Sequence, residues 1–427
     1  MALDFNSLPP EEPVPDKPPS PFLWAVVFLV LTLAGVFVVL MLWPAGEPTR
    51  TPWFWVCVTV FPTGMAVLVV TRPFSAYEGR RLDALAWNAA CKQYAEQLFA
   101  RESIPVSILG FAIRVTENDD ENRSGDIANG TLKLDAIASG HEQNESISAR
   151  WLQPIDASLA ADDPERQELV LEWLYDRLLT DLTASIASLS AELPLCVLLD
   201  ISGYAGNVDA LELWRTRWNS HKLRAAQARR AQEPLDLMTI DAWLDDQHGP
   251  LHGQAMLLVS ITLSKVIDET PLDGSAEAGV GLLFTSALLA TQFGLPSLAA
   301  LHRPLRSDNE NLDHALTRAL QWGSVEPGAV ESLWMTGFDG LSVGPLHSSF
   351  THVNQGKKRS EPLPEFDLDR AVGHAGLTSG WLAVACAADR AMQSSTPQLV
   401  AQRLADRTLV ATVTTTDNES KSRRSSA

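Results

Sequence analysis

The sequence has few cysteines and comparatively little positive charge. Its 427 residues include 4 cysteines, Cys57, Cys91, Cys196 and Cys386, and no two of them have the spacing of metal ligands. Nothing in this pattern indicates a disulfide framework, which favours a reducing compartment. The 52 Asp and Glu residues outnumber the 33 Lys and Arg residues, for a formal net charge of −19. Such an excess of negative charge argues against nucleic acid as a partner.

Several motifs of catalysis and nucleotide binding are also missing. The sequence has no Walker loop, no His-Glu-x-x-His motif and no Gly-x-Ser-x-Gly elbow. Gly279 and Gly281 are spaced as G-x-G, but no acidic residue completes a dinucleotide fingerprint behind them. The 9 histidines are dispersed along the chain. We therefore expect neither a metal site nor a cofactor.

Two long apolar runs stand near the N-terminus. Phe22–Trp43 carries no charged residue and is long enough to cross a hydrocarbon core of about 30 Å as a helix. A second run, Trp53–Val70, follows a short polar turn, and its Pro62 and Gly64 predict a kink. A buried helical hairpin is the alternative. Tryptophans near the ends of the runs favour the membrane, since indole rings prefer the headgroup layer. These residues are Trp24, Trp43, Trp53 and Trp55.

Charge around the hairpin predicts its orientation. Arg72, Arg80, Arg81 and Lys92 follow the second run, whereas the turn between the runs has only Arg50. By the positive-inside rule, the N-terminus and the large C-terminal part lie on the cytoplasmic side of a bacterial inner membrane. We expect five segments: a disordered Pro-rich tail at 1–21, a transmembrane hairpin at 22–71, an amphipathic connecting helix at 72–102, an α/β domain at 103–413 with halves meeting near 235–255, and a disordered tail at 414–427.

Beyond the hairpin, strand and helix signals alternate, which predicts a layered α/β architecture. Strands are predicted at 104–115, 193–201 and 255–263, a short one at 237–240, and helices from Asp163 and over 211–232. The last helix would have a strongly basic C-terminal half. In so acidic a chain, that face is either a solvated surface or a contact for acidic lipid or an acidic partner. The basic residues are Arg215, Arg217, Lys222, Arg224, Arg229 and Arg230.

The C-terminal half has a more specific order of motifs. An apolar run leads into Thr336-Gly-Phe-Asp339-Gly, and later Ala371-Val-Gly-His374-Ala-Gly-Leu-Thr-Ser-Gly opens an Ala-rich helix. Before them, Ala276-Glu-Ala-Gly-Val-Gly-Leu-Leu-Phe leads into a strand. This order resembles the C-terminal half of the β-ketoacyl synthases, members of the thiolase-like fold. The resemblance implies a thiolase-like α/β domain that follows two transmembrane helices.

The same resemblance implies catalytic residues from which this sequence departs. Such synthases use a Cys nucleophile at a strand-to-helix elbow and two His residues. Thr336 stands at the first His position and His374 at the second, while Asp369 and Arg370 stand where a Lys is expected. No Cys lies in the stretch before Ala255, where the elbow is expected. Cys196 lies inside a predicted strand, and Cys386 lies inside the predicted final helix. A structural role for the single retained His is the alternative. We expect no catalytic residue, and a candidate groove formed by Thr336, Asp339 and His374.

The layout of an anchor followed by a helix that runs into Ser103-Ile-Pro-Val-Ser is similar to adaptor proteins that load lipase effectors onto the type VI secretion machine. We therefore predict a non-enzymatic, inner-membrane adaptor or scaffold that binds a protein, such as a secreted effector or a secretion component. Homodimers are expected by analogy with the fold. The alternative is a membrane-bound enzyme acting on acyl chains through Cys196 or His374. A sensor role has little support, because the loop between the spans is short.

Overall fold

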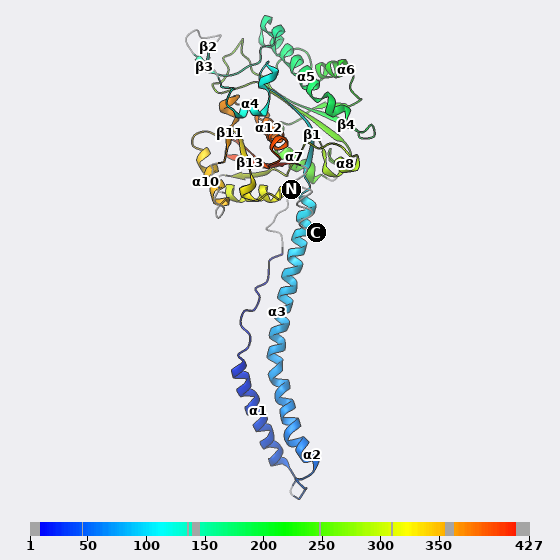
Figure 1. The fold of residues 1–427 in the computed structure, drawn as a ribbon, viewed down its shortest axis with the longest axis vertical. Helices are drawn as coiled ribbons and strands as arrows, with labels where there is room; N and C mark the ends of the chain where they lie inside the picture. Colours follow the sequence, from blue (N-terminus) through cyan, green and yellow to red (C-terminus); the bar gives the residue numbers. More distant parts are fainter. Residues whose placement is uncertain are drawn as a thin grey trace. The chain divides into compact units, whose positions relative to one another are not determined.

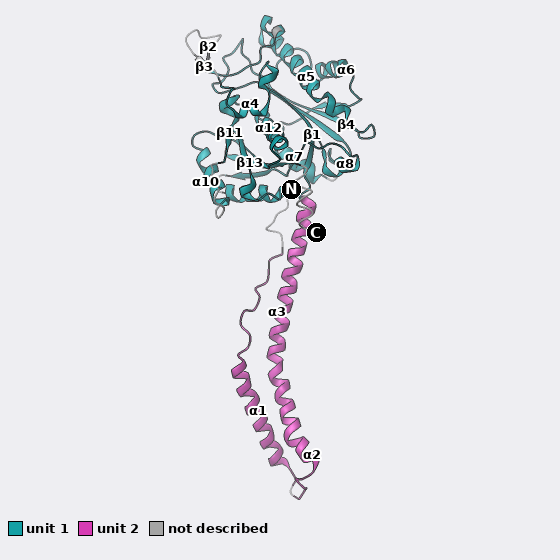
Figure 2. Ribbon diagram, in the orientation of Figure 1, with its two compact units in different colours: residues 1–2, 103–427 teal, residues 3–102 magenta. Residues whose placement is uncertain are grey.

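A computed structural model describes residues 9–44, 46–134, 136–138, 146–246, 249–308, 311–354 and 363–415. It divides into two units, Leu3–Glu102 and Ser103–Ala427 (Figure 2). The division falls where the helical sequence changes to a β-branched one. Residues 1–8 and 416–427, which belong to the two tails that we predict to be disordered, lie outside the described residues.

The first unit is a helical hairpin (Figure 1). One arm is α1 (Pro21–Leu42); the other is α2 (Pro52–Trp55), a π-helical turn η2 (Val56–Val60) and α3 (Phe61–Glu102). Both arms are long and apolar enough to cross a membrane. The irregular turn directly precedes Pro62, where a kink is predicted. The segments predicted at 53–71 and 72–102 are both helical and are continuous in α3.

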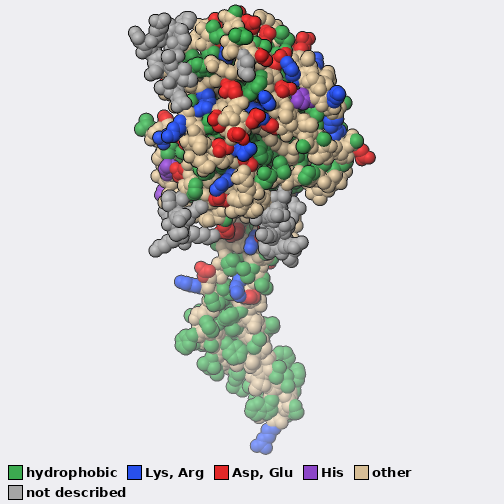
Figure 3. Space-filling model, turned by 45° about the horizontal axis from the view of Figure 1, so that its top comes forward, with side chains coloured by type: hydrophobic (Ala, Val, Ile, Leu, Met, Phe, Trp, Pro, Cys, Tyr) green, Lys and Arg blue, Asp and Glu red, His purple; other side chains and the backbone are tan. Residues whose placement is uncertain are grey.

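Apolar side chains cover much of the hairpin surface, as the space-filling view shows (Figure 3). Phe22, Leu29, Phe37 and Met65 are each more than half exposed. Such large exposed apolar surface is what a helix that faces lipid needs. Between the arms, Gly35 permits close packing, because a Cβ at this position would lie 2.7 Å from the Cβ of Pro62.

Residues 9–20 contact α3, although a disordered tail is predicted there. The Asn88 side chain accepts a hydrogen bond from the Glu12 N–H at 2.8 Å and donates one to the Glu12 carbonyl at 2.9 Å. The Tyr77 hydroxyl donates to the carbonyl of Pro15 at 3.0 Å. Proline stiffens the segment, which lowers the entropy cost of laying it along a helix. The structure therefore differs from the predicted tail over these residues.

The second unit is built on a large mixed sheet. Its strands are β1 (Val106–Arg114), β4 (Leu195–Ser202), β5 (Gln227–Arg230), β6 (Ala255–Thr262), β7 (Ala278–Ser286), β8 (Ala299–Leu301), β9 (Leu305–Asp308), β10 (Ser332–Thr336), β11 (Glu365–Asp367), β12 (Gln398–Leu404) and β13 (Arg407–Thr414). The order is β11-β10-β12-β13-β8-β1-β7-β6-β4-β5, with β9 on β13. β2 (Ala136–Ala138) and β3 (Ser146–Ser148) pair separately.

The strand order is palindromic. In one half β5 runs parallel to β4, β4 parallel to β6, and β6 antiparallel to β7. In the other half β11, β10, β12 and β13 repeat these relations in the same order. The central strands β1 and β8 pair antiparallel. The halves therefore meet in the 287–298 connection, not near 235–255 as predicted, because β6 and β7 pair with strands of the first half.

Two glycines occupy equivalent places in the two halves. Gly203 follows β4 and Gly337 follows β10, with φ of +74° and +77°. A Cβ on Gly203 would overlap the carbonyl oxygen of Leu263, and one on Gly337 would overlap that of Arg403. Each overlap occurs one residue beyond a paired position of two parallel strands. Only glycine fits such a backbone, so the same constraint operates twice.

Helices cover the sheet and connect its strands. They are α4 (Ser124–Ala128), α5 (Asp163–Ala187), α6 (Ala210–Ser220), α7 (Met238–Asp245), α8 (Ala287–Gln292), α9 (Leu312–Trp322), α10 (Val343–Val353), α11 (Leu368–Ala371) and α12 (Thr378–Ser394), with the 3₁₀ turns η3 (Asp119–Glu121), η4 (Ile155–Leu159) and η6 (Pro327–Ala329). α7 begins within the short strand predicted at 237–240, where Ile240 and Trp243 pack inward at helical spacing.

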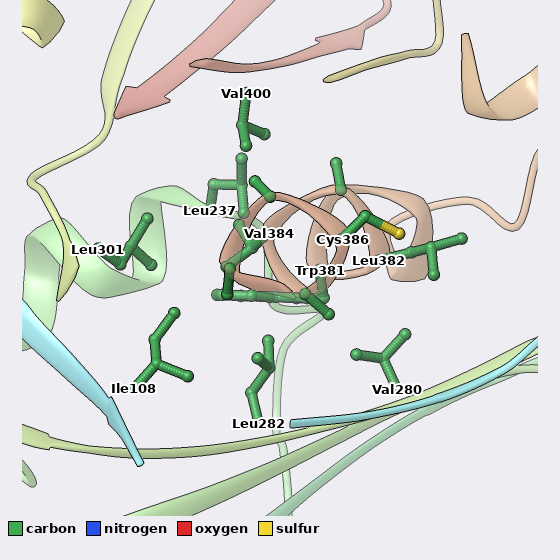
Figure 4. Packing of buried hydrophobic residues seen from close by; sticks show 14 of the residues in the cluster. Ile108, Leu237, Val280, Leu282, Leu301, Trp381, Leu382, Val384, Cys386 and Val400 are labelled. Carbon is green, nitrogen blue, oxygen red and sulfur yellow. The ribbon is translucent and has the colours of Figure 1, made fainter. Parts of the chain in front are cut away.

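The helix α12 forms the centre of the core (Figure 4). Trp381, which is fully buried, packs among side chains of the sheet and donates a hydrogen bond from Nε1 to the Leu235 carbonyl at 2.9 Å. Ile108, Leu282 and Val400 belong to the same cluster. In the first half, the helix between the equivalent strands is α7, which has 8 residues against 17 in α12. The repeat is therefore asymmetric at the core helix.

Candidate functional site

The loop between α11 and α12 is fixed by backbone hydrogen bonds to the chain ahead of β7. The His374 N–H donates to the Gly274 carbonyl at 2.7 Å, and the Ala276 N–H donates to the His374 carbonyl at 3.0 Å. The Ala375 N–H donates to the hydroxyl of Ser379 at 2.8 Å. The Gly-His-x-Gly turn singled out in the sequence is thus a rigid entrance to the buried helix.

Asp369 joins two of the three predicted groove residues. The Thr336 hydroxyl donates to Oδ1 of Asp369 at 2.7 Å, and the Gly337 N–H donates to Oδ2 at 2.5 Å. Nδ1 of His374 lies 3.3 Å from Oδ1 of Asp369. Thr336 ends β10 and Asp369 lies in α11, so strand and helix ends converge on the imidazole. Sequence reasoning noted Asp369 only as a departure from a family Lys.

These contacts set the charge states of the pair. Burial by itself favours a higher pKa for Asp369, but hydrogen bonds from His374 and Thr336 outweigh it and lower the pKa. The hydrogen bond to Asp369 raises the pKa of His374 despite partial burial. The pair therefore favours imidazolium and carboxylate. Within the described residues, no hydrogen bond between a Ser or Cys side chain and the imidazole is present.

Asp339, the third predicted residue, does not join this group. Its carboxylate accepts hydrogen bonds from the Leu341 and Ser342 N–H groups at 3.2 and 2.8 Å and from the Ser342 hydroxyl at 2.6 Å. The hydrogen bond from Ser342 is the main cause that lowers the pKa of Asp339. Asp339 therefore closes the turn that precedes α10.

A second polar cluster adjoins the first turn of α12. The Thr378 hydroxyl lies 2.9 Å from the hydroxyls of both Ser260 and Thr262. Thr262 donates to the carbonyl of Ala375 at 2.8 Å. The Asp200 carboxylate accepts from Ser260 at 3.4 Å, and burial raises its pKa. Sequence reasoning missed this cluster, although its strand residues lie near the carboxyl ends of β4 and β6, where α/β folds tend to place sites.

The cysteines of this unit are not placed as nucleophiles. Cys196 is buried within β4, and Cys386 is fully buried in α12, where desolvation raises the pKa of its thiol. A reactive thiolate needs the opposite environment. Residues 231–237, which link β5 to α7 as residues 368–377 link β11 to α12, contain no Cys, Ser or Thr.

The predicted basic helix is wrong in its second half. α6 ends at Ser220, and Lys222 has a φ of +52°, which no α-helix accommodates. Gln227–Arg230 is the strand β5. The prediction extended the helix to Gln232, but the apolar residues that pack α6 on the core end at Trp218. Without a buried stripe the helix gains no packing energy and stops.

The six basic residues therefore differ in role. Arg224 donates to the carbonyls of Ser190 and Leu193 at 2.8 and 2.7 Å, which fixes the loop after α5. Arg217 forms an ion pair with Glu172 at 2.5 Å. The other four are exposed, and no ion pair is described for them within residues 9–415 outside the gaps: Arg215, Lys222, Arg229 and Arg230.

Two hollows lie away from His374. One, of about 400 Å³, is lined by α6, the following loop and the first residues of β5, including Trp214, Trp218 and Arg215. The other, of about 490 Å³, lies beside β1 and α5. Its Arg114 is paired with Asp181 at 2.8 Å.

Comparison with known proteins bears on the fold. The sequence matches no family model and no curated protein. The structure is similar to the ketosynthase from module 6 of the bacillaene synthase from Bacillus subtilis 168, at 9% identity, covering 73% of this chain and 72% of that one, with a TM-score of 0.50. It is also similar to the ishigamide ketosynthase/chain length factor, at 15% identity, covering 73% and 99%, with a TM-score of 0.49. The predicted thiolase-like α/β fold is confirmed.

Proposed function

We propose that the protein is a membrane-anchored, non-catalytic ketosynthase-like domain that binds a protein partner. The observation that carries the proposal is that no nucleophilic side chain stands where the resembled synthases have their catalytic Cys. The segment between β5 and α7 offers no thiol or hydroxyl, and both cysteines of the domain are buried in regular structure. Acyl transfer through a covalent intermediate requires an accessible, activated nucleophile.

We place the anchor in a bacterial inner membrane, with the N-terminus and the large domain in the cytoplasm. Support comes from Arg72, Arg80, Arg81 and Lys92, which follow the second apolar run, against one Arg in the turn between the arms. The partner that we propose from the layout is a secreted effector or a component of the type VI secretion machinery. Such a partner would be held at the membrane without chemistry on the part of this domain.

The test is purification of the tagged full-length protein from its native membrane, with identification of the proteins bound in stoichiometric amount. A Cys196→Ala, Cys386→Ala double variant is the matched comparison, because it removes both thiols of the domain and no surface charge. Equal recovery of an effector or secretion component by the two proteins supports the proposal. Recovery of acyl carrier species alone contradicts it.

The acyl-handling alternative has one observation in its favour, the charged pair of His374 and Asp369. Incubation with a thiol-reactive acyl analogue tests it directly. Selective modification of Cys196, together with loss of turnover in Cys196→Ser, would establish an enzyme. A His374→Gln variant that binds the partner as the parent does places this pair outside partner binding.

A further inference from the structure

We infer that the open edge of β5 takes up an acidic, extended segment of the partner as an added strand. This inference rests on the proposed adaptor function and names its docking surface. β5 ends the sheet, with β4 on one side and no further strand among the described residues on the other. An edge strand presents unpaired backbone donors and acceptors, and an added strand is a recurrent way to use them.

The register shows which backbone groups are open. The Ala231 N–H donates to the carbonyl of Leu199 in β4 at 2.8 Å. Backbone groups of successive strand residues point alternately to the two sides, so Arg229 faces β4 while Ala228 and Arg230 face outward. Each of these outward residues offers one N–H and one C=O to an incoming chain.

Charge at this edge selects the occupant. Arg229 and Arg230 are exposed, and as neighbours in a strand they place positive charge on both faces of the edge. Arg215, in the middle of α6, lines the hollow beside this strand and is exposed as well, as is Lys222 just beyond the helix. The exposed Arg229 and Arg230 make the strand itself basic, in a chain whose formal net charge is −19. Complementarity therefore favours a segment rich in Asp and Glu.

The hollow of about 400 Å³ adjoins the same edge and adds a place for one side chain. Ala228 belongs both to the strand and to the lining, so a strand added here can direct a side chain into the hollow. Trp214, Trp218 and Leu223 belong to its lining, and the ionisable residues of the lining are Arg215 and Arg224. Backbone pairing, positive charge and room for one side chain thus coincide at this edge.

A second copy of this chain is a poor occupant of the edge. Antiparallel pairing of two β5 strands about a two-fold axis would bring Arg229 and Arg230 of each copy close to those of the other. Like charges placed opposite one another across strands are destabilising. The edge therefore suits a different, acidic chain.

The experiment uses full-length protein in phosphatidylcholine nanodiscs and a fluorescent peptide of alternating Glu and Val, followed by anisotropy. Arg229→Glu with Arg230→Glu should weaken binding about tenfold or more, since two attractions become repulsions. Ala228→Pro removes an outward N–H and should also weaken binding. Arg407→Glu, an exposed Arg on β13, is the matched control and should stay within about twofold. Thermal melts verify that each variant is folded.

Several results overturn the inference. It fails if the peptide does not bind, if a peptide with Lys in place of Glu binds equally well, or if the double Arg variant binds the peptide as the parent does. Displacement of the peptide by phosphatidylglycerol in the nanodisc would indicate a lipid site instead. Dimers of the parent that are lost in the double Arg variant would indicate a second copy of this chain. Partner purification with the same variants separates the two proposals. If the double Arg variant still binds the partner, the docking surface proposed here is wrong and the adaptor function stands. If the protein binds the peptide but no partner co-purifies from native membranes, the adaptor function is wrong and the binding site at the β5 edge stands.

Discussion

Asp369 and His374 lie five residues apart in sequence, and their side chains meet with 3.3 Å between Oδ1 and Nδ1. The end of α11 lies between them, and His374 belongs to the turn that opens α12. The Asp369 carboxylate also accepts a hydrogen bond from Thr336 at the end of β10, and this second contact fixes the carboxylate that holds the imidazole. Its side chain remains 42% exposed, which leaves the charged ring in contact with solvent. This geometry makes the pair a sensitive reporter of pH.

The first prediction concerns that pH dependence. The raised pKa of His374 gives stability that is complete below about pH 6.5 and is lost as pH rises through the folded-state pKa. The lowered pKa of Asp369 gives stability that is present above about pH 3.9 and is lost as pH falls through its folded-state value. His374→Gln should therefore cost at most about 1 kcal/mol near pH 5.5 and close to nothing near pH 9.

Denaturant titrations of parent and variant at both pH values measure this cost. An NMR titration of the His374 ring should give a pKa above the ordinary value, and Asp369→Asn should bring it back. Equal destabilisation at the two pH values would sink the assignment of the pair as charged.

The second prediction concerns a buried ion pair. Glu277 is fully buried and accepts hydrogen bonds from Arg166 at 2.6 Å and from the backbone of Leu152 and Ser264 at 2.8 Å each. Glu277→Gln leaves the Arg166 charge buried without a counterion. We expect a loss of about 3–5 kcal/mol in the free energy of unfolding, measured with urea.

An exposed acidic residue near this pair supplies the control. Glu269 forms an ion pair with Lys265 at 2.6 Å, and both side chains are well exposed. Glu269→Gln should change the free energy of unfolding by less than about 0.5 kcal/mol. Similar losses for the two Glu→Gln variants would contradict the importance given to burial.

The third prediction concerns thiol reactivity. Because Cys196 and Cys386 are buried, and burial raises the pKa of Cys386, neither should react with iodoacetamide in the folded protein. Mass spectrometry should find both alkylated only after unfolding. Leu272→Cys, at a position 80% exposed, provides a reactive reference. Rapid alkylation of native Cys196 would reopen the enzymatic alternative.

The fourth prediction concerns packing of the hairpin. A Cβ at Gly35 would come within 2.7 Å of Pro62, whereas one at Gly64 would meet nothing within 4 Å. Gly35→Leu should force the arms apart and cost about 1–3 kcal/mol, while Gly64→Leu should be tolerated. The helical circular dichroism of each variant during heating in detergent gives the comparison. Equal melting of both variants would show that the arms do not pack there.

Strong local patterns made much of the fold predictable. The apolar runs at 104–115, 193–201 and 255–263 correspond to β1, β4 and β6, and the helix predicted from Asp163 is α5. Each of these segments is buried along most of its length, so hydrophobic spacing and structure coincide. The two apolar arms were equally plain from length and composition.

Long-range contacts account for what the sequence did not predict. Arg224 looks like part of a helix face, but its carbonyl partners are more than thirty positions earlier, and no local pattern announces them. Asp369 is positioned by a hydrogen bond from Thr336, which lies 33 residues before it in the sequence. Asp200 and Thr378 meet through Ser260, which lies in a third segment.

The paired glycines, Gly203 and Gly337, have an evolutionary implication. Two halves that repeat both a strand order and a backbone constraint point to a duplicated gene, whose half-length ancestor would have associated with itself across the axis between β1 and β8. The two halves now differ in their core helices, because α12 has 17 residues and α7 has 8, and β5 carries Arg229 and Arg230. The two halves therefore resemble each other in backbone topology and differ in their side chains.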